Sequence, residues 1–142
     1  MELEGKIWKS GKFWLVEVPA VEVMTQGYTR KEALKMIADA IEGLVNCYFP
    51  NESQDFQVIV KEYKKGVIGV STLNNSLMLA FSLRRQREVS KSTIREVAER
   101  LGSNSPNAYA RYEKGRARIS LDQYERLLQA VNPQQNFHLR VV

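Results

Sequence analysis

Residues 93–121 of this 142-residue chain read TIREVAERLGSNSPNAYARYEKGRARISL. The stretch opens with the T-x-x-E form of a capping box, in which two side chains satisfy backbone N–H groups at a helix start. A glycine then ends the first helix. Ser105 followed by Pro106 suits an N-cap with proline at the first helical position. The segment therefore predicts two short helices, over about 93–101 and 106–112, joined by a glycine-containing turn.

Two short helices joined in this way form a helix-turn-helix, whose second helix enters the DNA major groove. Residues 97–102 (VAERLG), residues 112–116 (YEKGR) and the Ser120-Leu121 helix start resemble the XRE/Cro-like helix-turn-helix family. Two features depart from that family's pattern. The stretch after the turn glycine is one residue longer, and Ile94 stands where many members have a phosphate-contacting glutamine. Both departures concern DNA contacts rather than the fold.

The exposed start of the second helix predicts which residues meet DNA. An asparagine can bond adenine through paired donor and acceptor groups, and an alanine methyl can contact a thymine methyl. Basic residues just past the helix are expected to hold phosphates and so position the protein. The predicted DNA-contacting residues are Thr93, Ser105, Asn107, Ala108, Arg111, Lys114, Arg116 and Arg118. Tyr109 and Tyr112 are expected to be core aromatics rather than stacking partners for bases.

The first half of the chain has the period of β-strands rather than of helices. A single amphipathic helix is expected inside it, starting at a second capping box, Thr29 to Glu32. Beyond residue 74 the period of two gives way to 3.6, so we expect two domains, 1–74 and 75–142. The fold class is α+β: an antiparallel sheet with one helix, then an all-α domain. The expected strands lie near residues 7–8, 13–18, 21–24, 56–62 and 67–71.

The charge of the two halves differs. Residues 1–74 carry nine Lys and Arg against ten Asp and Glu, a net charge of −1, whereas residues 75–142 carry twelve against six, a net of +6. Such a charge difference is typical of chains in which one part binds a polyanion. An ordinary solvated basic face is the alternative, and the helix-turn-helix favours nucleic acid.

Residues 13–19 (FWLVEVP) and 25–34 (TQGYTRKEAL) look like the HicB antitoxin domain. That family has a strand, a proline-containing turn, a T-Q-G step and a T-x-x-E-A-L helix start. This sequence departs from the family pattern at residues 21–24 (VEVM), where family members usually have a proline-glycine-cysteine-like step. The resemblance implies a partial RNase H-like fold for the first domain, and the family commonly fuses that domain to a helix-turn-helix.

The resemblance implies an antitoxin of a type II toxin–antitoxin system. Such a protein would neutralise a HicA-type mRNA-cleaving ribonuclease by direct binding and repress its own operon through operator DNA. Glu17 and Glu22 are expected to meet cations of the toxin, whereas Glu32 is expected to cap its helix. Two alternatives stay open: a stand-alone repressor with a ligand-sensing N-terminal domain, and an interaction module that has lost DNA binding.

Catalysis and cofactors are not expected. The acidic residues of the first half show no obvious pairing for a metal-dependent nuclease, and Asp39 and Glu42 suit a solvated helix face. His138 is the single histidine and lies in a C-terminal tail. Cys47, the single cysteine, excludes an internal disulfide and a Cys-rich zinc site. We therefore predict neither enzymatic activity nor a bound metal.

Location and assembly follow from similar arguments. No apolar run approaches the roughly 20 residues of a membrane-spanning helix, and the N-terminus lacks the apolar core of a secretory signal. The cytoplasm is therefore the expected compartment. Because Cro-like readers pair two recognition helices on a palindrome, a homodimer or higher homo-oligomer is expected. The alternating tail, residues 137–142, could add a strand across such an interface.

Overall fold

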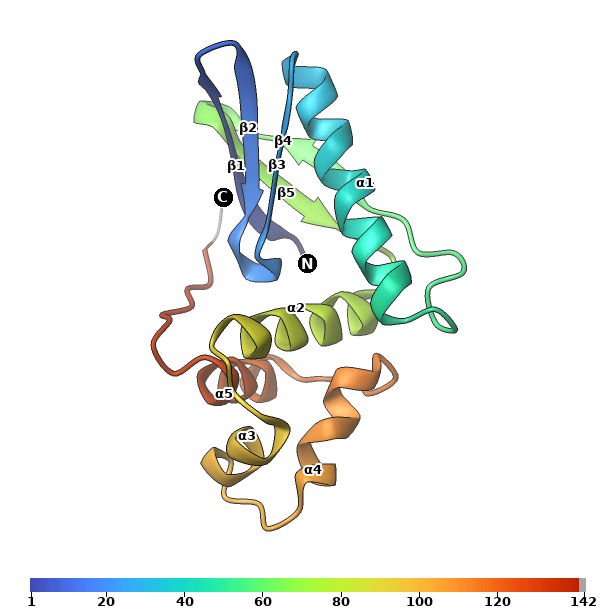
Figure 1. Cartoon of the computed structure of the whole chain (residues 1–142), viewed down its shortest axis with the longest axis vertical. Helices are drawn as coiled ribbons and strands as arrows, with labels where there is room; N and C mark the ends of the chain where they lie inside the picture. Colours follow the sequence, from blue (N-terminus) through green and yellow to red (C-terminus); the bar gives the residue numbers. More distant parts are fainter. Residues whose placement is uncertain (141–142) are drawn as a thin grey trace.

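The computed structural model describes residues 1–140. The described chain begins with β1 (Leu3–Ser10), β2 (Phe13–Val18), β3 (Val23–Gly27), α1 (Arg30–Tyr48), β4 (Ile59–Glu62) and β5 (Val67–Ser71). It continues with α2 (Asn75–Val89), α3 (Ile94–Arg100), α4 (Pro106–Ala110) and α5 (Leu121–Val131). Short 3-10 turns lie at Pro19–Val21, Lys64–Gly66 and Arg111–Lys114. The α+β class and the β-β-β-α-β-β order of the first half are confirmed (Figure 1).

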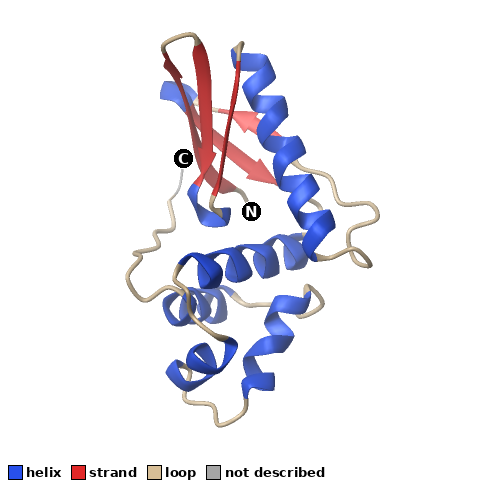
Figure 2. Cartoon of the chain, viewed as in Figure 1, coloured by secondary structure: helices blue, strands red, loops and turns tan. Residues whose placement is uncertain are grey.

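The strands form an antiparallel sheet in the order β3-β2-β1-β5-β4. Side chains alternate between its faces, so Leu3, Ile7 and Val16 point to the side on which α1 packs (Figure 2). We call the opposite side the open face, and no helix of residues 1–140 packs on it (Figure 2). Met24 and Ile59 there are 57% and 54% exposed. The N-terminal half is therefore a two-layer unit with one sheet face left accessible.

The start of α1 follows the capping box in part. The Glu32 amide donates to Thr29 Oγ1 at 3.1 Å, as expected, but the Glu32 carboxylate accepts from the Tyr28 amide at 2.7 Å rather than from that of Thr29. Gly27 precedes this cap because a Cβ there would lie 2.6 Å from the Ala33 nitrogen. The T-Q-G step thus lets β3 turn directly against the first turn of α1.

The strand expected at residues 21–24 is wrong in its first half. Pro19–Val21 form a 3-10 turn, and β3 begins only at Val23. Glu22 between them has a φ of 51°, the left-handed region that few non-glycine residues adopt. The proline fixes φ and lacks an N–H, which suits the start of such a turn. The alternation of apolar residues therefore extends through a turn that makes no strand–strand hydrogen bonds, so alternation alone did not identify a strand here.

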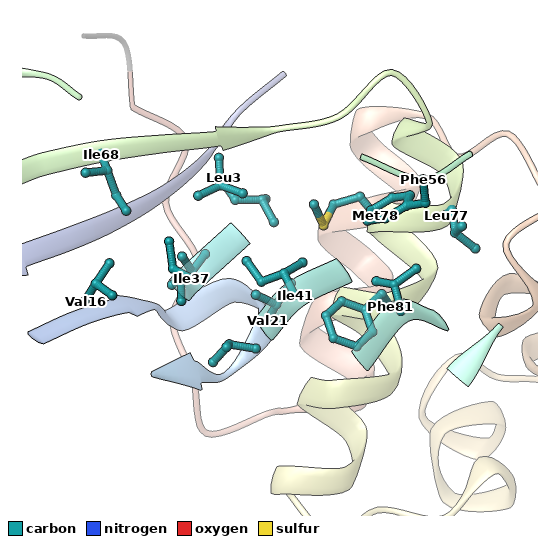
Figure 3. Packing of buried hydrophobic residues seen from close by; sticks show 14 of the residues in the cluster. Leu3, Val16, Val21, Ile37, Ile41, Phe56, Ile68, Leu77, Met78 and Phe81 are labelled. Atoms are coloured by element: carbon teal, nitrogen blue, oxygen red, sulfur yellow. The ribbon is translucent and has the colours of Figure 1, made fainter. Parts of the chain in front are cut away.

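Helix α2 contributes to two hydrophobic cores. Leu77, Met78 and Phe81 pack with α1 and the sheet, beside Ile41 and Phe56 (Figure 3). The second core joins α2 to the remaining helices: Leu83, Val97, Ala98, Tyr109, Leu127, Leu128, Ala130 and Val131. The predicted boundary falls at Asn74, the N-cap of α2, whose side chain accepts a hydrogen bond from the Leu77 amide. Its division of the chain into two domains stays a prediction.

Two further expectations concern membrane-spanning helices and the C-terminal tail. Within residues 1–140, no helix is both long and apolar enough to cross a membrane. The tail after α5 runs back toward the open face, where Arg140 Nη1 lies 3.6 Å from Glu4 Oε1. Its described part contains no strand. The last two residues of the strand expected at 137–142 lie outside the described residues.

Candidate nucleic-acid interface

The first helix of the predicted helix-turn-helix is α3, and its capping box is complete. The Glu96 amide donates to Thr93 Oγ1 at 3.1 Å, and the Thr93 amide donates to Glu96 Oε2 at 2.7 Å. Thr93 remains exposed, as a DNA-contacting residue must be. Gly102 follows the helix with a φ of 76°, so the chain turns away without strain.

The recognition helix α4 is shorter than expected. Pro106 stands at its first position, as predicted, but the Ser105 hydroxyl makes no capping hydrogen bond. Instead the Ser105 amide donates to Ser103 Oγ at 3.2 Å. After Ala110 the backbone tightens into the 3-10 turn Arg111–Lys114, which Gly115 closes with a φ of 75°. The reading element is therefore one α-turn and one 3-10 turn.

A buried ion pair anchors this reading element to α2. Arg87 donates from Nε to Glu113 Oε1 at 2.6 Å and from Nη2 to Glu113 Oε2 at 3.0 Å, a bidentate arrangement. The Tyr109 hydroxyl donates to the same carboxylate at 2.5 Å. The hydrogen bonds to Glu113 raise the pKa of Arg87, and burial together with Glu113 raises the pKa of Tyr109. Three polar groups thus fix the orientation of α4.

The predicted contact residues of α4 and its exit all face solvent. Ser105, Asn107 and Ala108 are exposed at the start of the helix, and Arg111 and Lys114 are exposed at its end. The start of α4 lies at the end of the molecule away from the sheet, whereas the 3-10 turn Arg111–Lys114 runs back toward α2 (Figure 1). Duplex DNA could therefore approach α4 without meeting the N-terminal half.

The two tyrosines of this segment have different environments. Tyr109 is fully buried in the second core, as expected for a core aromatic. Tyr112 is only partly buried, and the Arg111 guanidinium lies 4.8 Å from its ring centre. Arg111 also donates to the Tyr112 hydroxyl at 2.9 Å. The aromatic ring therefore holds this arginine in place at the exposed surface.

Arg116 and Arg118 lie beside the N-terminal half. Arg116 Nη2 donates to Glu52 Oε1 at 2.9 Å, although its own side chain is 74% exposed. Arg118 borders an open groove of about 830 Å³ between residues 51–59 and the start of α2. Both remain predicted phosphate contacts, and Arg116 would have to exchange a carboxylate for a phosphate.

The same groove bears on the ligand-sensing alternative. Its lining is mostly amide, hydroxyl and charged side chains, with Phe56, Ile59 and Leu73 as the apolar members. Ligand pockets are usually enclosed and mainly apolar. This groove therefore adds no support for a metabolite-binding domain. Within residues 1–140, no cluster of three His, Cys, Asp or Glu side chains could hold a metal ion.

The two expected toxin contacts lie in different places. Glu17 is on the open face, opposite Lys6 of β1 and Met24 of β3. Glu22 is at the junction with α2, where its carboxylate lies 3.4 Å from Gln86 Nε2 and its carbonyl accepts from Arg85 at 2.7 Å. A single partner surface could therefore contact Glu17 alone more readily than Glu17 and Glu22 together.

Sequence reasoning missed the partner of Glu113 and a further exposed cation. Glu113 was recognised only as part of a motif, and nothing local indicated Arg87, 26 residues earlier. Arg95 is exposed next to Ile94, and Ile94 itself packs against the second core. The isoleucine thus has a structural role, and Arg95 is a neighbouring cation that the family pattern did not suggest.

Comparison with known proteins gives one informative match. No curated protein matches the sequence. Residues 79–135 match a protein family described as a helix-turn-helix domain. The match spans α3, the turn and α4, together with most of α2 and all of α5. The C-terminal part of this chain therefore contains a helix-turn-helix DNA-binding domain.

Proposed function

We propose that this protein is a DNA-binding antitoxin of a HicAB-like type II system. In this proposal the C-terminal domain represses the operon by binding operator DNA, and the N-terminal domain binds and neutralises a HicA-like ribonuclease. The protein would act in the cytoplasm as a homodimer or higher homo-oligomer, without enzymatic activity or a cofactor. The observation that carries the DNA-binding part is the anchored, solvent-facing start of α4.

Three features support reading of duplex DNA. Asn107 and Ala108 occupy the exposed N-terminal turn of α4, the part of a recognition helix that meets base edges. Lys114 is exposed at its far end, where a phosphate contact would fix the register. The net charge of +6 on residues 75–142 supplies the long-range attraction to a polyanion.

The antitoxin part is supported by the resemblance of residues 13–34 to the HicB domain. The elements that carry it are β2, the proline turn, β3 and the capped start of α1. The open face of the sheet offers an accessible surface on which a protein partner could dock. Glu17, on that face, is the better placed of the two carboxylates that we expect to meet a basic toxin.

The DNA-binding part is tested by titrating the duplex upstream of the gene with the full chain at several salt concentrations. We expect Asn107→Ala to weaken binding to the specific site by about 1–3 kcal/mol and to relax its base preference. Lys114→Ala should weaken specific and nonspecific binding alike and reduce the salt slope by about 0.9. Unchanged affinity in both variants would exclude α4 as the reading element.

The antitoxin part is tested by a pull-down with the tagged full chain at low and high salt. A small basic protein that remains bound at high salt, and that cleaves RNA once it is separated, would support the proposal. Glu17→Lys should weaken that complex and leave duplex binding unchanged. An eluate without a protein partner, from a chain that still binds its upstream DNA, would favour the ligand-sensing repressor.

A further inference from the structure

The N-terminal half has a charge polarity that its net charge of −1 conceals. Helix α1 ends against α2, since Tyr48 and Phe81 have ring centres 5.4 Å apart, so the start of α1 lies at the far end of this half (Figure 1). The strand register puts the β1–β2 turn and the 3-10 turn before β5 at that same end. Seven of the nine Lys and Arg residues of 1–74 lie in this farther half of the sheet and of α1: Lys9, Lys12, Arg30, Lys31, Lys35, Lys64 and Lys65. The other two lie nearer the middle of the sheet, Lys6 opposite Glu17 and Lys61 level with Glu4 through Gly69.

The acidic residues are distributed in the opposite way. Exposed or partly exposed carboxylates occupy the half nearer α2: Glu2, Glu4, Glu22, Asp39, Glu42, Glu52 and Asp55. Of the three others, Glu32 accepts from the Tyr28 amide, Glu62 pairs with Arg30, and Glu17 lies opposite Lys6. The far end is therefore a cationic surface with most of its own carboxylates already engaged.

Aromatic side chains are interleaved with these cations. Phe13 and Tyr28 lie side by side with ring centres 5.2 Å apart, and Tyr28 is 67% exposed. Lys12 Nζ lies 5.3 Å from the Phe13 ring centre. At the start of α1, the Arg30 guanidinium lies 5.0 Å from the ring centre of Trp14 in β2. These contacts keep positive charge next to accessible ring faces.

We call this surface the distal pole: Lys9, Lys12, Phe13, Tyr28, Arg30, Lys31, Lys64 and Lys65. It extends from the end of β3 to the start of β5, which is three strand spacings, or roughly 15 Å. A basic groove or surface with exposed aromatic rings is the arrangement that binds single-stranded nucleic acid, because lysines follow the phosphates and rings stack on unpaired bases. Duplex DNA keeps its bases stacked and could not use Tyr28 in this way.

We propose that the distal pole of the N-terminal domain is a second nucleic-acid site, specific for single strands and separate from the helix-turn-helix. Its ligand class is single-stranded nucleic acid, recognised through phosphate charge and base stacking rather than through sequence. A basic protein partner would be repelled from this pole, so the toxin proposed above has to dock elsewhere. The inference does not depend on the antitoxin proposal.

The test is fluorescence anisotropy of the full chain with a labelled oligouridine of about 15 nucleotides. Tyr28→Ala should weaken binding about tenfold, whereas Tyr28→Phe, which keeps the ring, should bind as the unmodified chain does. The double variant Lys12→Ala/Lys64→Ala should reduce the salt slope by about 1.4, the value for two single-strand phosphate contacts. Oligodeoxyuridine of equal length differs from the oligouridine only in the 2′-hydroxyl: weaker binding to it would identify the ligand as RNA, and equal binding would identify it as a single strand of either kind.

A matched variant separates the two sites. Lys114→Ala/Arg118→Ala removes the same charge from the helix-turn-helix domain, so it should weaken duplex binding and leave oligouridine binding unchanged. Thermal unfolding of each variant shows whether it is folded. The proposal is wrong if the distal-pole variants bind oligouridine normally, or if the helix-turn-helix variant loses it. It is equally wrong if the distal-pole variants lose only a protein partner in the pull-down.

Discussion

At the scale of single residues, the contact between Arg87 and Glu113 has the largest expected effect on stability. The Arg87 and Glu113 side chains are only 16% and 8% exposed, and each neutralises the charge of the other. Removing one partner of such a pair leaves an uncompensated buried charge, which is far more costly than losing a surface ion pair. The pair also joins the reading element to α2, so its loss affects both folding and DNA binding.

We expect Glu113→Ala to lower the free energy of unfolding by about 3–5 kcal/mol. Glu113→Gln should cost less, because the amide oxygen can still accept a hydrogen bond from Arg87 or Tyr109. Denaturant titration measures both differences. Arg84→Ala, which removes an exposed i,i+4 pair with Glu88, is the control and should change stability by less than about 1 kcal/mol. A cost for Glu113→Ala no larger than the control's would contradict the buried-pair argument.

Two tyrosines, the buried Tyr109 and the partly buried Tyr124, give the protein a predictable response to alkaline pH. Burial raises the pKa of Tyr109, with Glu113 adding to the effect, and burial raises the pKa of Tyr124. A tyrosine ionises near pH 10 in the unfolded chain but stays neutral in the fold. Stability should therefore be complete below pH 10 and fall above it, by about 1.4 kcal/mol per pH unit for Tyr109, with Tyr124 adding to the decline in the same direction.

The measurement is denaturant unfolding across pH 9 to 11. Tyr109→Phe should make the alkaline decline shallower by about 1.4 kcal/mol per pH unit, because one titrating group has been removed. Tyr28→Phe, at an exposed position, should keep the full slope. If Tyr109→Phe instead declines as steeply as the unmodified chain, the buried hydroxyl does not control this response.

At the scale of elements, local signals predicted where helices begin and missed what happens between them. The T-x-x-E box at Thr93 was confirmed in both of its hydrogen bonds, because a cap depends on residues three apart. Ser105 has no Glu or Gln three residues later, and its hydroxyl makes no capping bond because the Ala108 amide donates to the Ser105 carbonyl instead. The turn at Pro19–Val21 was read as strand because its apolar residues alternate. Contacts that join distant segments, such as Arg116 with Glu52, have no sequence signal at all.

The two helix starts can be compared directly. We expect Thr93→Ala to destabilise the protein by about 1 kcal/mol, because the Glu96 amide loses its partner. Ser105→Ala should change stability by no more than about 0.5 kcal/mol, because no capping bond is lost. Thermal or denaturant unfolding measures both. Equal losses would mean that Ser105 caps α4 in solution. Reduced operator binding by a fully stable Ser105→Ala would support its predicted contact with DNA.

At the scale of the whole molecule, α2 connects the two halves through polar as well as apolar contacts. Ser82 Oγ donates to the Ala20 carbonyl at 2.7 Å, Gln86 Nε2 to that of Pro19 at 2.9 Å, and Arg85 Nη2 to that of Glu22 at 2.7 Å. These side chains lie at i, i+3 and i+4 and so share one helix face. They bind the carbonyls of residues 19–22, a turn that makes no strand–strand hydrogen bonds of its own, and these bonds hold the strained turn in place.

The same side chains reach the C-terminal helices. Gln86 Oε1 accepts from Asn132 Nδ2 at 2.9 Å, just after α5, and Ser82 lies 2.8 Å from the Tyr124 hydroxyl. Gln86 and Ser82 are buried, so each bond is shielded from water. A buried polar group that loses one of several partners is costly to leave unsatisfied. The two halves are therefore expected to unfold together.

We expect calorimetry of the full chain to show one cooperative transition, because α2 supplies buried residues to both cores. The triple variant Ser82→Ala/Arg85→Ala/Gln86→Ala removes the side-chain bonds of α2 to the 19–22 turn, to Tyr124 and to Asn132 while keeping the apolar contacts of α2. Its transition should broaden or divide into two, with the sheet domain and the helical domain melting separately. Arg126→Ala, an exposed change on α5, should leave a single transition. If the triple variant still melts in one transition with an unchanged ratio of van't Hoff to calorimetric enthalpy, the apolar packing of α2 alone couples the halves. The distal pole and the reading helix would then be held in a fixed relation by the cores rather than by the polar joint.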